Sequence, residues 1–224
     1  ENNNIIVTAE DLYNMCGLRE ITTMSVEIPV AKGIDVYIFE GDNILDVVSQ
    51  YNMFSGGGCH VPEWGLGIIY RAYAKNTDKD IIDLASYFRQ NDIPCDIMGL
   101  EPGWQSSSYS CSYTWDKERY PNYKEMIKYL KDNDFHINLW EHAFVNATSP
   151  IYKDLHDYSG DYEVWQGIIP DFATDEAKKI FADFHRENLV SMGIDGFKLD
   201  ECDNSDFVND WSFPNCTELP SGLD

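Results

Sequence analysis

The run Gly196-Phe197-Lys198-Leu199-Asp200-Glu201 holds the residues of this sequence that are best suited to chemistry. If the run is a β-strand, Lys198 and Asp200 point to the same face, because strand side chains alternate with period two. A lysine ammonium beside a carboxylate lowers the pKa of that carboxylate, so Asp200 stays ionised and available as a nucleophile. A lysine that faces a buried interior is costly unless paired, and Asp200 is the available partner. We therefore predict that Asp200 is catalytic.

Acidic and aromatic residues also follow two earlier apolar runs, as Glu101-Pro102-Gly103-Trp104 and as Trp140-Glu141-His142. Aromatic faces stack on the apolar side of sugar rings, and carboxylates bond the hydroxyls and carry out glycosidic chemistry. This combination predicts a sugar site. The predicted substrate-binding residues are Glu101, Trp104, Trp140, Glu141 and Lys198.

Several of these residues also have an ordinary structural explanation. Trp104 and Trp140 could both be hydrophobic core residues, since Trp is commonly buried. Glu101 at a strand end could cap a helix or pair with a base. Glu141 and His142 are strand neighbours that point opposite ways, so only one of them can face the site.

The sequence gives weaker support to metal binding and to catalysis by a serine or cysteine nucleophile. The acidic residues at the end of the lysine-aspartate run lack the alternating spacing of a calcium loop. They are Asp200, Glu201, Asp203 and Asp206. The sequence contains no Gly-x-Ser-x-Gly elbow, and its six cysteines form no Cys-x-x-Cys pair. We predict no metal and no cofactor.

Composition restricts the partners. The formal net charge of −23 argues against nucleic acid and against an anionic membrane surface, since both need clustered Lys and Arg. No run reaches the roughly 18 apolar residues of a membrane span. A neutral oligosaccharide or glycoside fits better. The first residue is Glu, so we expect a processed or excised piece, and both an exported and a cytoplasmic location remain open, as does the oligomeric state.

Residues 61–224 alternate apolar strand patterns with amphipathic helix patterns. Strands are predicted at 66–73, 97–100, 135–140 and 194–200. The helices between them carry apolar residues at helical spacing, and the first starts at a capping-box-like Thr77-Asp78-Lys79-Asp80. The second follows Pro121 and should end at a left-handed Asn133, and the third starts at Thr174 and is closed by Gly193.

Residues 1–60 differ from this pattern and are predicted to be the end of a β-rich domain. Residues 21–27 and 36–40 read as short strands rich in β-branched residues, and 43–51 as a short helix. The run Ser55-Gly56-Gly57-Gly58 then marks a boundary.

Alternating strands and helices indicate parallel pairing in an α/β fold, either an open doubly wound sheet or a (β/α)8 barrel. No Gly-x-Gly-x-x-Gly follows the first predicted strand, which disfavours a nucleotide-binding open sheet. The polar and aromatic residues gather just past strand ends, where barrel enzymes place their sites. Because four strands are predicted, we expect the first half of a barrel.

The order of these motifs resembles glycoside hydrolase family 31, the α-glucosidase and α-xylosidase group, over residues 36–206. Phe197 to Glu201 resembles the nucleophile strand of that family. The resemblance implies a retaining glycosidase with Asp200 as nucleophile. The other matching segments are Tyr37 to Gly41 (closing an amino-terminal β-sandwich), Trp64 to Gly67 (the first barrel strand), Glu101, Trp104, Trp140, and Pro170 to Phe172.

Departures from the family pattern bear on the sugar and on the acid/base. Glu101 stands where the family often has Asp, and Trp140-Glu141-His142 replaces a common Trp-x-Asn. The resemblance places the general acid/base beyond residue 224, and Glu201, next to Asp200 on a strand, would face away from the site. α-Galactosides, α-N-acetylgalactosaminides, a related α-galactosidase clan and a non-catalytic carbohydrate-binding module therefore stay open as alternatives.

Overall fold

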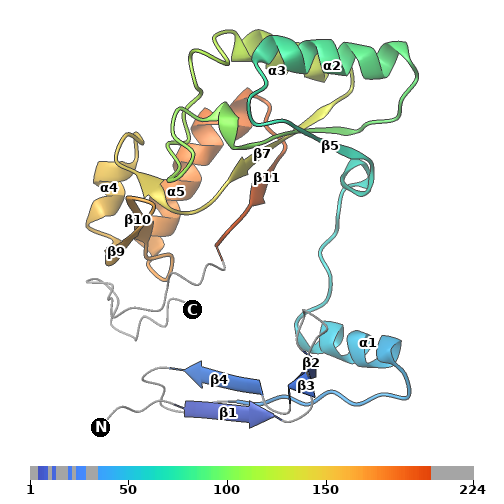
Figure 1. The fold of residues 1–224 in the computed structure, drawn as a ribbon, viewed down its shortest axis with the longest axis vertical. Helices are drawn as coiled ribbons and strands as arrows, with labels where there is room; N and C mark the ends of the chain where they lie inside the picture. Colours follow the sequence, from blue (N-terminus) through green and yellow to red (C-terminus); the bar gives the residue numbers. More distant parts are fainter. Residues whose placement is uncertain (1–4, 10–11, 14–19, 22–23, 29–34, 203–224) are drawn as a thin grey trace. The chain divides into compact units, whose positions relative to one another are not determined.

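The structure is a computed structural model that describes residues 5–9, 12–13, 20–21, 24–28 and 35–202 (Figure 1). The chain divides after His60 into two compact units, which we describe separately. Within the described part of the chain, no helix is both long enough and apolar enough to cross a membrane.

The described residues of the first unit form four short strands and one helix. Strand β1 (Ile5–Ala9) pairs antiparallel with β4 (Met24–Ile28), and β2 (Leu12–Tyr13) pairs with β3 (Glu20–Ile21). Helix α1 (Ile44–Phe54) begins at Asn43, whose side chain accepts hydrogen bonds from two backbone amides of the first turn.

Two expectations for this unit need correction. The strand predicted at 21–27 is divided between β3 and β4. Residues 36–40 form no strand, although they favour one, because no strand among the described residues pairs with them. Instead, the rings of Tyr37 and Phe39 contact Phe54 of α1, at centroid distances of 4.5 and 5.4 Å.

The second unit is built on a four-stranded parallel sheet. Its strands are β5 (Ile69–Ala72), β6 (Ile97–Leu100), β7 (His136–Glu141) and β11 (Gly196–Leu199), and each lies next to its predecessor in the order β11-β7-β6-β5. All three pairings are parallel. This is the strand order of consecutive βα units in a barrel, as predicted.

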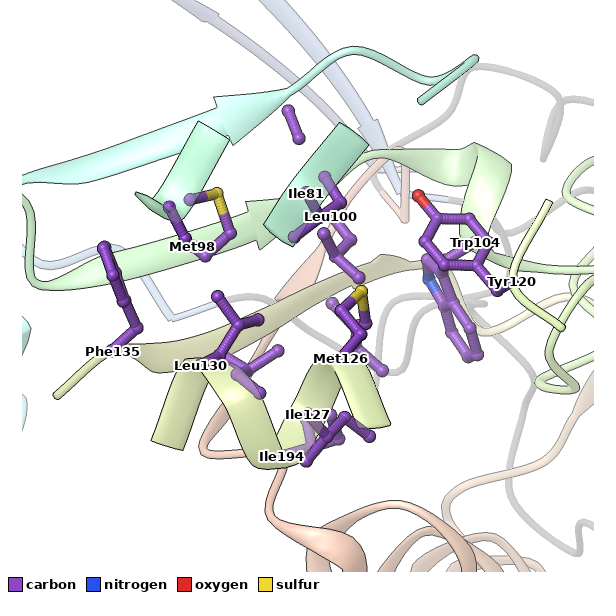
Figure 2. Packing of buried hydrophobic residues seen from close by; sticks show 14 of the residues in the cluster. Ile81, Met98, Leu100, Trp104, Tyr120, Met126, Ile127, Leu130, Phe135 and Ile194 are labelled. Carbon is purple, nitrogen blue, oxygen red and sulfur yellow. The ribbon is translucent and has the colours of Figure 1, made fainter. Parts of the chain in front are cut away.

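Helices α2 (Asp78–Gln90) and α3 (Tyr123–Asp132) connect these strands and lie side by side along one face of the sheet (Figure 1). Their apolar stripes pack on β6, and Figure 2 shows Ile81 of α2 and Met126 of α3 close to Leu100. Burial of this face removes the apolar surface of both helices from water, which is the main driving force for the unit.

An additional subdomain lies between β7 and β11, within the third βα repeat of the barrel. After β7 the chain forms β8 (Val145–Asn146), α4 (Tyr152–His156), β9 (Ser159–Val164) and β10 (Gly167–Pro170), in which β10 pairs antiparallel with β8 and β9. Helix α5 (Asp175–Asn188) then leads to β11 and packs its predicted stripe on this subdomain.

Short 3-10 helices explain two differences from the sequence predictions. Residues Glu63–Leu66 form the 3-10 helix η1, so the Trp64 to Gly67 segment precedes the first barrel strand rather than forming it. Two further 3-10 helices are η2 (Pro102–Trp104) and η3 (Val190–Met192). Helix α5 ends at Asn188, so Gly193, at φ 112°, closes η3 and not the helix predicted from Thr174.

The end of α3 also differs from the prediction. Asn133 is the C-cap of α3, but its φ is −111°. The left-handed conformation is adopted by the next residue, Asp134, at φ 57°. An aspartate tolerates this conformation because its short side chain can bond locally.

The cap of α2 gives a test of this fold. The Thr77 hydroxyl accepts from the Asp80 amide at 3.2 Å, and the Asp80 carboxylate accepts from the Thr77 amide at 2.8 Å. We expect Thr77→Ala to lower the free energy of unfolding by about 1 kcal/mol, because the first turn loses its side-chain acceptor. Urea unfolding followed by circular dichroism measures the change. Thr77→Ser is the matched control, and an equal loss in both variants would contradict the assigned cap.

Candidate functional site

The strand register places two rows of side chains on the face of the sheet opposite α2 and α3. In the first row Arg71 of β5 is level with Gly99 of β6, and Gly99 is level with Asn138 of β7. In the second row Trp140 of β7 is level with Lys198 of β11. In a closed barrel this face is the interior, so its polar residues form the floor and rim of the candidate site.

Arg71 crosses this face and holds Glu101. Its Nε donates to Glu101 Oε1 at 2.5 Å, and another guanidinium nitrogen donates to Asn138 Oδ1 at 2.5 Å. The crossing needs Gly99, because a Cβ at this position would lie 2.7 Å from the guanidinium. Glu101 therefore pairs with a base, one of the structural explanations that the sequence left open, and it still keeps a quarter of its side chain exposed.

Asp200 lies directly after the end of β11 and receives hydrogen bonds from two side chains. Lys198 Nζ donates to Asp200 Oδ2 at 2.7 Å, and Trp140 Nε1 donates to the same oxygen at 2.8 Å. The Glu201 amide donates to the other oxygen, Oδ1, at 3.2 Å. The predicted pair of Lys198 and Asp200 is thus present in the structure.

These contacts set the charge of Asp200. The hydrogen bond from Lys198, followed by the one from Trp140, lowers the pKa of the Asp200 carboxyl below its usual value. Asp200 is therefore ionised at neutral pH, while its side chain stays about one-third exposed to an approaching ligand.

The two predicted tryptophans are both buried, but only Trp140 donates a hydrogen bond to Asp200. Trp140 is 1% exposed and reaches Asp200 only through its indole nitrogen. Trp104 is fully buried in the core around β6 and donates from Nε1 to the Trp140 carbonyl at 2.8 Å. Trp104 has no exposed ring face for a sugar. It supports the strand that carries Trp140.

Glu141 lies on the opposite face of β7 from Trp140, as their adjacent positions require. Its carboxylate is buried against α5, where Oε2 is 3.2 Å from His185 Nε2. It therefore has no line of contact to a ligand at Asp200. Its backbone carbonyl does accept from the Asp200 amide at 2.8 Å, so Glu141 links α5 to the strand end that carries the candidate nucleophile.

His142, the other member of this pair of neighbours, lies among aromatic rings beside Trp140. Burial lowers the pKa of His142 to about 4, so the ring is neutral near pH 7. Its Nδ1 accepts from the Phe144 amide at 3.1 Å, which puts the ring proton on Nε2.

Sequence reasoning missed three residues of this site: Arg71, Asn138 and Tyr109. Arg71 and Asn138 are polar residues flanked on both sides by apolar ones within their strands, and that interruption is the signal that could have identified them. Tyr109 lies in a Ser-rich loop, 106–113, where no periodic pattern indicates which way a side chain points.

The acidic residues near Asp200 do not form a metal site in the described part of the chain. Within it, no group of three or more His, Cys, Asp or Glu side chains is placed to hold an ion. Asp203 and Asp206 lie outside the described residues. Glu201 is not part of β11, because its φ of 57° breaks the strand.

The geometry supports nucleophilic chemistry on a neutral ligand. An ionised carboxylate, oriented by two donors on one oxygen, lies on the rim of a polar sheet face. A second carboxylate, Glu101, is fixed by a guanidinium on the same face and can accept from hydroxyl groups.

Comparison with known proteins agrees with this arrangement. Residues 59–221 match the family described as the glycosyl hydrolases family 31 TIM-barrel domain. Over 177 residues the chain is 29% identical to an α-glucosidase of Bacillus thermoamyloliquefaciens, covering 73% of this chain and 22% of that protein. Over 184 residues it is 23% identical to an α-xylosidase of Lactiplantibacillus pentosus, covering 75% and 24%. The chain thus spans about a quarter of the length of these relatives.

Solved structures show the same fold. A family 31 α-xylosidase from a soil metagenome, complexed with xylose, superposes with a TM-score of 0.73 at 18% identity, over 90% of this chain and 32% of that one. A family 31 dextranase of Flavobacterium johnsoniae, complexed with glucose, gives 0.64 at 23% identity, over 75% and 23%. The predicted barrel class is confirmed.

The contact between Lys198 and Asp200 predicts a pH effect. We expect Lys198→Met to raise the pKa of Asp200, because the largest contribution to its lowering is removed. Titration of carboxyl ¹³C resonances by NMR measures the shift. In the wild-type protein this contact favours folding above the unfolded-state pKa of Asp200, and the benefit is lost as the pH falls through the lower folded-state value.

Lys128→Met is the matched control, since Lys128 pairs with Asp132 on the exposed side of α3, away from this face. It should leave the titration of Asp200 unchanged. A pKa of Asp200 that is the same in Lys198→Met and in wild type would refute the assigned interaction.

Proposed function

Because this chain belongs to glycoside hydrolase family 31, we propose that Asp200 is the nucleophile of a retaining hydrolase that cleaves terminal α-linked sugars. The observation that carries the proposal is the carboxylate of Asp200, held ionised by Lys198 and Trp140 at the carboxyl end of β11. Barrel enzymes place catalytic residues at this end of their strands.

In the proposed reaction the less strongly bonded oxygen of Asp200, Oδ1, attacks the anomeric carbon of the bound sugar. A bond forms between Oδ1 and this carbon, the glycosidic carbon–oxygen bond breaks, and the leaving oxygen takes a proton from a general acid. Water, deprotonated by the same residue, then attacks the anomeric carbon and releases Asp200 as a carboxylate. Lys198 and Trp140 hold Oδ2 throughout, which keeps Oδ1 aimed at the sugar.

The general acid is proposed to lie beyond residue 224, as the family resemblance implies. Retention requires the two carboxyl groups to be about 5 to 5.5 Å apart, on opposite sides of the scissile bond. Glu201 is a poor candidate, because it directly follows Asp200 in the chain and cannot reach the opposite side of a sugar bound to Asp200.

Glu101 is proposed to bind sugar hydroxyls, because Arg71 fixes its carboxylate on the inner face. Trp140 is proposed to act through the nucleophile that it orients. For Trp104 and Glu141 their burial supports a positioning role in place of direct substrate contact. The substrate is a glycoside, and α-glucosides, α-xylosides, α-galactosides and α-N-acetylgalactosaminides form the panel for a first assay with aryl glycosides.

Replacement of the proposed nucleophile tests the function. In the complete enzyme that contains this chain, we expect Asp200→Asn to lower kcat by about 10⁴-fold or more, the scale on which loss of a nucleophile lowers turnover. Binding should persist, because the amide keeps the shape of the carboxylate. Release of p-nitrophenol and calorimetric binding of the glycoside measure the two quantities. Asp132→Asn, at an exposed position of α3, is the control. Near-wild-type turnover by Asp200→Asn would refute the assignment.

A second expectation concerns residues 1–224 produced alone. We expect no glycosidase turnover, because a missing general acid alone costs about 10²–10⁴-fold. The described strands also leave apolar residues of the sheet edges open, with Leu199 64% and Ile69 43% exposed. Such surface favours association. The assay uses the same aryl glycosides, with the complete enzyme as control. Turnover equal to that of the complete enzyme would show that the acid/base lies within these residues.

A further inference from the structure

We propose that Tyr109 forms the stacking wall of the sugar site, so that the apolar C–H face of a pyranoside lies on its ring while the anomeric carbon faces Asp200. This inference rests on the proposed function and adds to it a substrate-binding residue that the family motifs do not include.

The ring of Tyr109 lies beside Trp140, the residue that orients the proposed nucleophile Asp200. Its centroid is 5.3 Å from that of Trp140, the residue that donates to Asp200. It also lies 5.0 Å from Trp165, edge to face, and 5.8 Å from His142. Trp140 belongs to β7, His142 directly follows this strand, and Trp165 lies in the turn between β9 and β10, so segments distant in sequence converge behind one ring.

Exposure distinguishes Tyr109 from the rings around it. Tyr109 is 50% exposed, whereas Trp140 and His142 are 1% and 0% exposed. Large aromatic side chains bind apolar surfaces well, because they bring much contact area with little loss of conformational freedom. The exposed ring of Tyr109 packs on two buried rings and on the half-buried Trp165, close to the ionised Asp200. This arrangement can bind a ligand that has an apolar face and a reacting carbon.

The hydroxyl of Tyr109 lies near acidic side chains. Burial, followed by the negative charges of Glu201 and Asp200, raises the pKa of Tyr109 to about 12. The phenol therefore stays protonated at neutral pH and serves neither as a base nor as a nucleophile. What Tyr109 offers to a ligand is the face of its ring.

The loop that carries Tyr109 is fixed on both sides of this residue. The Ser110 amide donates to the Trp165 carbonyl at 3.1 Å, and the Cys111 amide donates to the Phe144 carbonyl at 2.9 Å. The Ser108 hydroxyl donates to the Pro102 carbonyl at 2.7 Å. The ring is thus preorganised, and a ligand that stacks on it need not order the loop.

The test compares Tyr109→Ala with Tyr109→Phe in the complete enzyme. We expect Tyr109→Ala to raise KM by about tenfold, on the scale of one aromatic contact, with a smaller effect on kcat. Tyr109→Phe keeps the ring and should retain most of the affinity that Tyr109→Ala loses. The control is Tyr87→Ala, since Tyr87 is similarly exposed, at 55%, but lies on α2 away from Asp200.

Binding is measured separately by titrating p-nitrophenyl glycosides into Asp200→Asn and into the double variant Asp200→Asn/Tyr109→Ala. The double variant should bind about tenfold more weakly. Circular dichroism and the Tm check folding, and Tyr109→Leu, which keeps apolar volume without a flat ring, replaces Tyr109→Ala if the latter fails to fold.

The outcomes separate the two proposals. Unchanged KM and Kd in Tyr109→Ala, with turnover still abolished by Asp200→Asn, would overturn the stacking wall and leave the nucleophile in place. Equal losses in Tyr109→Phe and Tyr109→Ala would overturn it as well, because the hydroxyl would then bind the sugar. Weaker sugar binding in the double variant would support the wall even if the wild-type enzyme hydrolysed none of the aryl glycosides, a result that would refute the proposed function alone.

Discussion

The hydrogen bonds from Lys198 and Trp140 to one oxygen of Asp200 are the constraint on which the rest of the site depends. They require two neighbouring parallel strands in the register that puts Trp140 level with Lys198. A shift of one residue would turn one of these side chains to the opposite face, because strand side chains alternate. The core packed behind β6 and β7 therefore supports the proposed nucleophile by fixing this register.

The two faces of the sheet meet different physical demands. The outer face carries apolar residues such as Met98 and Leu100, which gain stability by burial under α2 and α3 (Figure 2). The inner face carries Arg71 and Asn138, whose polar groups would be costly there without partners. They satisfy one another and Glu101, and the absence of a side chain at Gly99 leaves the space that this requires.

Much of the fold could be predicted from local patterns. The strand at 97–100, the capped start of α2 at Thr77 and the order of strands and helices follow from hydrophobic period and helix-cap chemistry, which act within a few residues. The strand expected at 36–40 failed for the complementary reason. Strand propensity is realised only where another strand supplies hydrogen-bond partners, and no strand in the described part of the chain pairs with this segment.

By itself, the sequence determined the central pair of the candidate site: a lysine and an aspartate two residues apart on a strand must share a face, and their charges must interact. It also required Glu141 and His142 to point apart. Only the tertiary structure decided that Glu141 turns to His185 on α5, that Arg71 is the partner of Glu101, and that the ring of Tyr109 stands beside Trp140. The physical reason is distance along the chain: local spacing sets which side of an element a residue occupies, whereas the packing of separate elements sets what it meets there.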